Sequence, residues 1–168
     1  MHNLNELLEK ALYYCTLENI PFRKITHITV NNRLSKAWGR CLSKSGSGRY
    51  WIEVRGIIAD DKITPEKSAM EIILHEVIHT CEGCWNHGAL FKEYSKRLEK
   101  YGYYNVGGAS TTIAAMNIDN EVYTEKCKYE VRCTKCGYAI GKNRMCNLIK
   151  YPSIHTHNKC NAPFERVR

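Results

Sequence analysis

Two histidines and a glutamate near the middle of the chain form the pattern most suited to chemistry. His75, Glu76 and His79 spell H-E-x-x-H within the stretch EIILHEVIHT. On a helix, residues four positions apart lie on one face, so both imidazoles can reach one metal ion without distorting the backbone. Glu76 is then placed beside the open coordination position, where it can take a proton from water. The pattern predicts a catalytic zinc site, because a purely structural site has no use for Glu76.

Two histidines leave such a site short of a protein ligand, and His87 is the candidate for the third. His87 follows the expected end of the helix, so the chain can turn back and bring it toward the other two. Gly88 directly after it would allow a tight backbone. Cys81 and Cys84 leave alternatives open, because a C-x-x-C pair could supply thiolates to this ion or another, or act as a redox pair. Two thiolates on this ion would close the site and prevent catalysis.

The cysteines indicate a second metal site. The chain has nine of them, an odd number, and the N-terminal MHNLNELLEK lacks the apolar stretch of a signal peptide. In a reducing compartment, clustered cysteines are more often metal ligands than disulfides, so we expect a cytoplasmic protein. Cys133 and Cys136 form a zinc knuckle, and His157 and Cys160 offer a second pair at matching spacing. These four residues are the predicted ligands of a structural zinc ion.

Other cysteines and histidines compete for this role or fall outside it. Cys146 and His155 could each replace one of the four ligands, although we expect Cys146 to be a core residue. The isolated cysteines are best interpreted as buried or free thiols; they are Cys15, Cys41 and Cys127.

The net charge of +8 is concentrated near the C-terminus. Residues 1–120 contain 15 Lys/Arg against 13 Asp/Glu, whereas residues 121–168 contain 10 against 4. Such a concentration is typical either of a surface that binds a polyanion or of a solvated basic tail. Tyrosines alternate with these cations, a pattern that suits phosphate contact and base stacking. The candidate nucleic-acid contacts are Arg132, Lys135, Lys142, Arg144 and Lys150.

Hydrophobic periodicity predicts the elements that must position these residues. A helical stripe begins at Leu4 and ends at Cys15, a second helix carries H-E-x-x-H with Thr64 as N-cap, and a third covers roughly Gly88 to Tyr101. The segments rich in β-branched and aromatic residues predict three strands, at 25–32, 36–41 and 49–56. Residues 105–120 lack a clear period and are expected to form a connection.

These features predict two domains, with a boundary where the composition changes near residue 121. Residues 1–120 are long enough to bury a core, whereas residues 121–168 are too few to do so without a metal staple. No run of apolar residues approaches the roughly 18 that a membrane span requires. We therefore expect no membrane association, and we assume a monomer.

The ordered combination of motifs resembles the SprT-like family of zinc metallopeptidases. KAWGRC is similar to the family's Ala-x-Gly-x-Cys strand, LHEVIH and NHGALF to its H-E-x-x-H and downstream His-Gly-x-x-Phe, and VRCTKCGY…HNKCNAPF to its terminal zinc ribbon. The resemblance implies an α+β fold: a compact zincin-like domain of about three helices and a small β-sheet, plus a small β-rich zinc ribbon. It also implies one catalytic zinc on His75, His79 and His87, with Glu76 as general base.

The function implied by this resemblance is that of a zinc-dependent endopeptidase acting on DNA-associated or DNA-crosslinked proteins. Its partners would be a protein substrate and DNA. The main alternative is a non-catalytic DNA-binding or regulatory protein in which both zinc ions are structural. A redox protein that uses Cys81 and Cys84 is a further alternative, although no thioredoxin-like βαβ pattern surrounds the pair.

Overall fold

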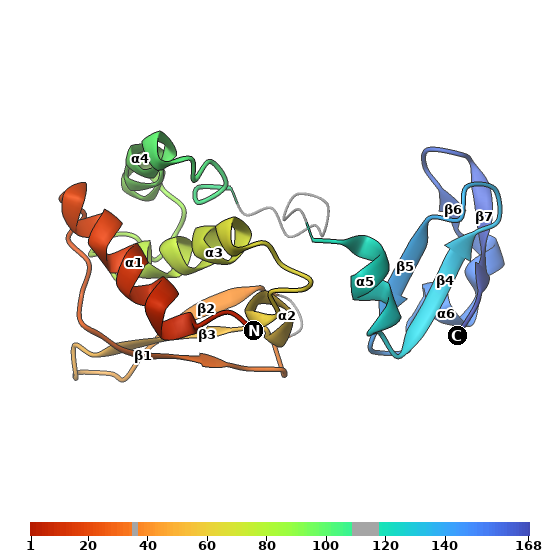
Figure 1. Ribbon diagram of the computed structural model, residues 1–168, viewed down its shortest axis with the longest axis horizontal. Helices are drawn as coiled ribbons and strands as arrows, with labels where there is room; N and C mark the ends of the chain where they lie inside the picture. The colour runs from red at the N-terminus through yellow and green to blue at the C-terminus, as the bar shows by residue number, and fades with distance from the viewer. Residues whose placement is uncertain (35–36, 109–117) are drawn as a thin grey trace. The chain divides into compact units, whose positions relative to one another are not determined.

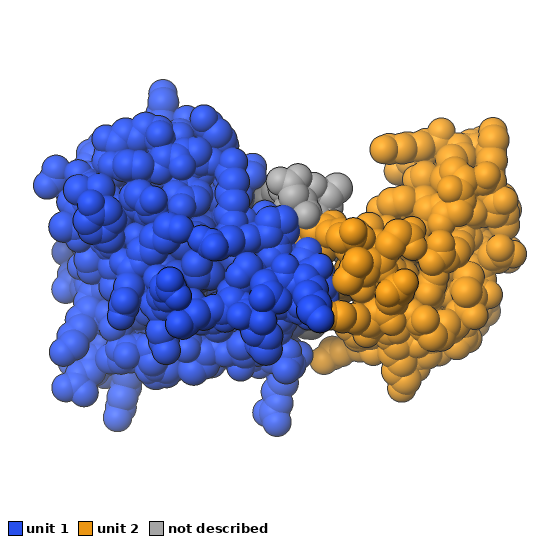
Figure 2. Space-filling model, viewed as in Figure 1, with its two compact units in different colours: residues 1–117 blue, residues 118–168 orange. Residues whose placement is uncertain are grey.

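A computed structural model describes residues 1–34, 37–108 and 118–168. The chain forms two compact units, Met1–Asn117 and Ile118–Arg168, coloured separately in Figure 2. The second unit begins slightly before the predicted boundary, because α5 (Asn120–Glu125) belongs to it and is capped by Asp119. Most of the predicted connection, residues 109–117, lies outside the described part of the chain.

Two helices cover one face of a three-stranded sheet in the first unit (Figure 1). The strand order is β1-β3-β2, with β1 parallel and β2 antiparallel to β3. Helices α1 and α3 lie on the sheet, and α3 also packs against α4. The elements are α1 (Leu4–Leu17), β1 (Ile25–Val30), β2 (Gly39–Ser43), β3 (Tyr50–Val54), α2 (Gly56–Ala59), α3 (Glu66–Ile78), α4 (Ala89–Leu98) and the 3₁₀ turn η1 (Glu99–Tyr101).

The sheet separates a buried face from an open one. Ile52 and Val54 on β3 are fully buried and alternate with the half-buried Trp51 and Glu53. Because successive side chains on a strand point to opposite faces, Trp51 and Glu53 lie on the face away from α1 and α3.

Some predicted boundaries are wrong. Strand β2 begins at Gly39 and continues to Ser43, later than the predicted 36–41. Pro65, not Thr64, occupies the N-cap position of α3, because the Thr64 hydroxyl donates a hydrogen bond to the carbonyl of Ile57 at 2.8 Å. Helix α2 was not predicted from the sequence pattern.

The second unit is a four-stranded antiparallel sheet with order β5-β4-β7-β6. Its small core consists of Val131, Cys133, Ile149, Ala162 and Phe164. The chain is thus mixed α+β with two small sheets, as predicted, although α5 and α6 were not expected. The remaining elements are β4 (Tyr129–Cys133), β5 (Ala139–Lys142), α6 (Asn147–Lys150), the 3₁₀ turn η2 (Pro152–Ile154), β6 (Thr156–His157) and β7 (Ala162–Arg166). No helix in the described ranges has the length and apolar character needed to cross a membrane.

Candidate functional site

The end of α3 presents two imidazoles on one face. His75 lies in the last turn, and His79 directly follows the last helical residue with its backbone N–H still bonded to the carbonyl of His75 at 3.3 Å. Because the two residues are four positions apart on a helical backbone, their side chains lie on the same face, and their Nε2 atoms are 3.1 Å apart. This is the same-face arrangement that the H-E-x-x-H spacing predicts.

The loop after α3 returns a third imidazole to this pair. Gly83 has φ +75°, a conformation that favours glycine, and the chain reverses there. The Nε2 atom of His87 lies 3.0 Å from that of His75. Gly88, which was expected to allow a tight backbone after His87, has φ −72° and is the N-cap of α4. The residue of this loop that needs the freedom of glycine is therefore Gly83. His75, His79 and His87 form a group that could hold a metal ion.

Backbone carbonyls orient two of these rings. The Nδ1–H of His75 donates to the carbonyl of Val106 at 2.8 Å, and that of His79 donates to the carbonyl of Cys84 at 2.7 Å. These bonds fix the tautomer in which Nε2 carries the free lone pair, the form that ligates a metal. Zn–N bonds of about 2.0–2.1 Å at tetrahedral angles separate the nitrogens by about 3.3 Å, close to the observed spacing. The donor set therefore fits a zinc ion.

The rings are also held in a partly apolar setting. Phe91 of α4, which is fully buried, has its ring centroid 4.9 Å from that of His75 and 4.8 Å from those of His79 and His87. Burial lowers the pKa of His75 to about 4, outweighing its bond to the Val106 carbonyl. Burial also lowers the pKa of His79. Both imidazoles are thus neutral near pH 7, as metal ligation requires.

A buried carboxylate supports the segment that contains Val106. Glu71 lies one turn before His75 on α3, and its two oxygens accept hydrogen bonds from the backbone N–H of Asn105 at 3.2 Å and the side-chain amide of Asn105 at 3.1 Å. These bonds tie residues 105–106 to α3 and so place the carbonyl that orients His75. No feature of the sequence indicated this role for Glu71.

Glu76 lies in the same pocket as the three histidines. The pocket has a volume of about 310 Å³, and strand β2 forms its opposite wall. Burial raises the pKa of Glu76 to about 8, and the backbone N–H of Cys41 opposes this by donating to the carboxylate. A cation held by the neighbouring imidazoles would lower this pKa and favour the carboxylate form that a general base needs. The lining residues are Ala37, Gly39, Arg40, Cys41, His75, Glu76, His79, Trp85 and His87.

Gly39 is required by the close approach of β2 to Glu76. A Cβ at this position would lie 3.0 Å from both Cγ and Oε1 of Glu76 and 3.0 Å from Cγ2 of Ile72. We expect Gly39→Ala to destabilise the fold by about 1–3 kcal/mol and to displace the carboxylate. Thermal unfolding measures the loss of stability relative to the wild-type chain. Ser43→Ala, at the exposed end of β2, is the control on the same strand; wild-type stability of Gly39→Ala would contradict the requirement for glycine.

Cys81 and Cys84 are buried but do not join the histidine group. Within the described residues, the group contains only the three imidazoles. Cys84 contributes its backbone carbonyl, which orients His79, rather than its thiol. The CEGC segment therefore acts here as a turn that positions the His79 ring.

The second predicted group assembles in the second unit. The Nδ1 atom of His157 lies 3.3 Å from Sγ of Cys136 and 3.2 Å from Sγ of Cys160, and Cys133 completes a group that could hold a metal ion. Burial works to raise the pKa of Cys133, but backbone amides of Cys136 and Lys135 outweigh it, and the pKa is lowered to about 6. A thiolate at neutral pH is the form that binds zinc.

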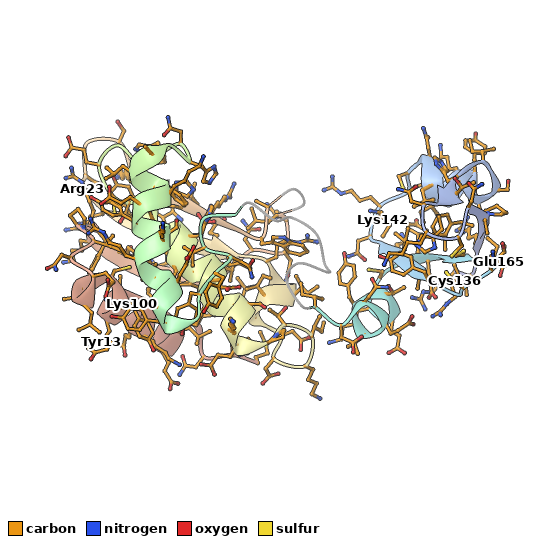
Figure 3. All side chains as sticks on the ribbon, turned by 90° about the horizontal axis from the view of Figure 1, so that it is seen from above. Tyr13, Arg23, Lys100, Cys136, Lys142 and Glu165 are labelled. Carbon is orange, nitrogen blue, oxygen red and sulfur yellow. The ribbon has the colours of Figure 1, made fainter. Side chains whose placement is uncertain are left out.

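The competing residues lie outside this group. Cys146 packs against the core of the second unit, as expected, and His155 is half-buried. Cys136 is the most exposed of the four candidate ligands and is labelled in Figure 3. Cys15 and Cys127 are buried, and Cys41 is half-buried beside Glu76.

The five candidate phosphate contacts differ in whether their positive charge is already paired with a carboxylate. Arg132 is half-buried and forms ion pairs with Glu121 at 3.1 Å and Glu130 at 2.5 Å, so its charge is already balanced. The other four cations are exposed and form no ion pair within the described residues; they are Lys135, Lys142, Arg144 and Lys150. Lys142 ends β5 and is labelled in Figure 3.

No family model matches the chain, and a comparison with curated proteins gives no match.

Proposed function

We propose that the chain is a zinc-dependent endopeptidase of the SprT-like type. The supporting observation is the convergence of three imidazoles on one point, two of them oriented by backbone carbonyls, with Glu76 in the same pocket. Three protein ligands leave one position of a tetrahedral site for water or substrate, which is the arrangement of a catalytic zinc. The adjacent carboxylate has the position that a general base needs.

Different residues of the pocket serve different steps of peptide hydrolysis. A bound zinc ion would polarise the scissile carbonyl and make an adjacent water more acidic. Glu76 takes a proton from the attacking water and later gives it to the leaving amine. The Cys41 amide holds the carboxylate in place, while Val106 and Cys84 keep the two ligand rings in the required tautomer.

The second group suits a structural zinc ion. Cys133, Cys136, His157 and Cys160 supply four protein ligands, so no position remains for substrate. The core beside it contains only five buried residues, which is too small to fold without such a staple.

DNA-associated proteins are the proposed substrates. Residues 121–168 carry 10 Lys/Arg against 4 Asp/Glu, and four exposed cations among them lack an acidic partner within the described residues. A basic surface of this kind binds phosphate without regard to sequence. It would keep the peptidase near proteins bound or crosslinked to DNA.

A cleavage assay tests this function. The zinc-loaded chain is incubated with a DNA-binding protein in the absence of DNA, with single-stranded DNA and with duplex DNA. The proposal expects zinc-dependent fragments, formed faster when DNA is present. The rival, a non-catalytic protein with two structural zinc ions, expects no fragments under any of these conditions.

A further inference from the structure

We propose that the open face of the first unit's sheet contains a binding site for single-stranded nucleic acid, in which Trp51 stacks on a base while Lys44 and Arg49 contact its phosphates. This site is separate from the pocket of Glu76 and from the basic residues of the second unit. It concerns binding, so it does not depend on whether the chain cleaves proteins.

The site is a shallow hollow where β1, β3 and the β2–β3 turn meet. Its volume is about 620 Å³, within the range of roughly 300–1,000 Å³ typical of ligand pockets. The lining residues carry two positive charges and no negative one; they are Thr26, Lys44, Ser47, Arg49 and Trp51.

The ring of Trp51 lines this hollow, and an irregularity in β1 places a second ring beside it. The register with β3 shifts between Ile25 and Ile28, so one extra residue on β1 faces Trp51. His27 is brought beside Trp51, with the ring planes only 7° apart and the centroids separated by 6.2 Å. The two parallel rings offer flat surfaces of the kind on which nucleic-acid bases stack.

The orientation of His27 is fixed within the fold. The Thr26 hydroxyl donates to the carbonyl of Tyr50 at 3.1 Å and accepts a hydrogen bond from Nδ1 of His27 at 2.9 Å. The imidazole plane therefore does not need to be ordered by the ligand, which lowers the entropic cost of stacking.

The cations are carried by a well-formed turn. The carbonyl of Lys44 accepts hydrogen bonds from the backbone N–H and the hydroxyl of Ser47 at 3.0 and 2.7 Å, and the Ser47 hydroxyl accepts one from the N–H of Arg49 at 3.2 Å. Gly46 and Gly48 have φ of +72° and +61°, which this turn requires. Lys44 and Arg49 are both exposed, and neither forms an ion pair within the described residues.

The acidic group that follows Trp51 on this face has its charge balanced within the fold. Glu53 follows two residues after Trp51, and its carboxylate accepts hydrogen bonds from Arg40 at 2.9 Å and Asn31 at 2.6 Å. Its charge is thus balanced by Arg40. A flat aromatic surface beside unpaired cations fits a chain of bases and phosphates, and an unpaired strand fits best because duplex bases are not free to stack.

The test measures fluorescence anisotropy of a labelled oligothymidylate of about 15 nucleotides, with a duplex of the same length as second probe. The zinc-loaded Glu76→Gln chain is used throughout, so that cleavage does not interfere. Trp51→Ala should weaken oligothymidylate binding about fivefold or more, Trp51→Phe should restore most of it, and duplex binding should not change. Tyr13→Ala, an exposed tyrosine on α1 (Figure 3), is the aromatic control.

The cations are tested by the salt dependence of the same binding. Lys44→Ala/Arg49→Ala should reduce the slope of log affinity against log salt by about 1.4, since each lost phosphate contact removes about 0.7. Lys92→Ala/Lys96→Ala on α4 removes the same charge elsewhere and should affect the slope much less. Both tests are repeated in a chain with Lys142, Arg144 and Lys150 changed to alanine, so that binding by the second unit cannot mask the effect.

The proposal is overturned if the Trp51 and Lys44/Arg49 variants match their controls in both backgrounds, or if the parent chain does not bind the oligonucleotide. It is also overturned if Trp51→Ala weakens duplex and single strand equally. None of these outcomes bears on the peptidase, which is measured by cleavage alone.

Discussion

Glu76→Gln is expected to abolish peptide cleavage while both zinc ions stay bound. The amide has nearly the same shape as the carboxylate but cannot accept the proton from the attacking water, so the rate should fall about 10²–10⁴-fold. The three imidazoles and their backbone partners are not altered. Initial rates on a DNA-binding protein substrate, together with zinc content by mass spectrometry, measure the two effects separately.

The matched control is Glu82→Gln, since Glu82 lies on the loop after α3 and its side chain is 89% exposed. It removes the same charge without reaching the pocket and should keep wild-type activity. Cleavage by Glu76→Gln at a rate similar to that of Glu82→Gln would show that Glu76 is not the general base.

Cys136→Ser is expected to unfold the second unit and leave the first unit folded. The small core beside the cysteines cannot offset the loss of a metal site, because structural zinc contributes about 10–16 kcal/mol in small domains. The first unit has its own core of buried residues from α1, α3 and β3, which this change does not touch. Hydrogen exchange followed by mass spectrometry should show lost protection in β4, β5 and β7 and unchanged protection in α3.

Cys146→Ser provides the control within the same unit. It makes the same chemical change at a half-buried cysteine that is not among the candidate ligands, so protection and zinc content should remain close to wild type. Retention of both zinc ions by Cys136→Ser would contradict the ligand assignment. Global unfolding by Cys136→Ser would contradict the independence of the two units.

The grouping of the candidate metal ligands could be predicted from the sequence because it depends on local spacing. A spacing of four residues on a helix brings His75 and His79 together whatever the surrounding fold. A C-x-x-C turn, with Gly137 at φ +72°, likewise brings Cys133 and Cys136 together. His87 could be inferred only from a break in the helix followed by a histidine. The turn at Gly83 that returns it to the pair is local, but its direction depends on how α4 packs.

The supporting groups could not be predicted, because they depend on contacts between distant segments. The carbonyl that orients His75 comes from Val106, 31 positions along the chain, and Glu71 reaches Asn105 over 34. A backbone carbonyl carries no sequence signal. The exclusion of a side chain at Gly39 likewise follows from how β2 packs against α3, which no local pattern encodes.

Zinc-edge X-ray absorption on the chain loaded with two zinc ions tests the central claim most directly. If His75, His79 and His87 hold one ion and leave a position beside Glu76, the two sites together contain three sulfur ligands, all from Cys133, Cys136 and Cys160. The fitted spectrum should then give three Zn–S bonds of about 2.3 Å for every two zinc ions, with nitrogen and oxygen completing both shells. Five Zn–S bonds for every two ions would place Cys81 and Cys84 on the first ion, close that site, and contradict the peptidase.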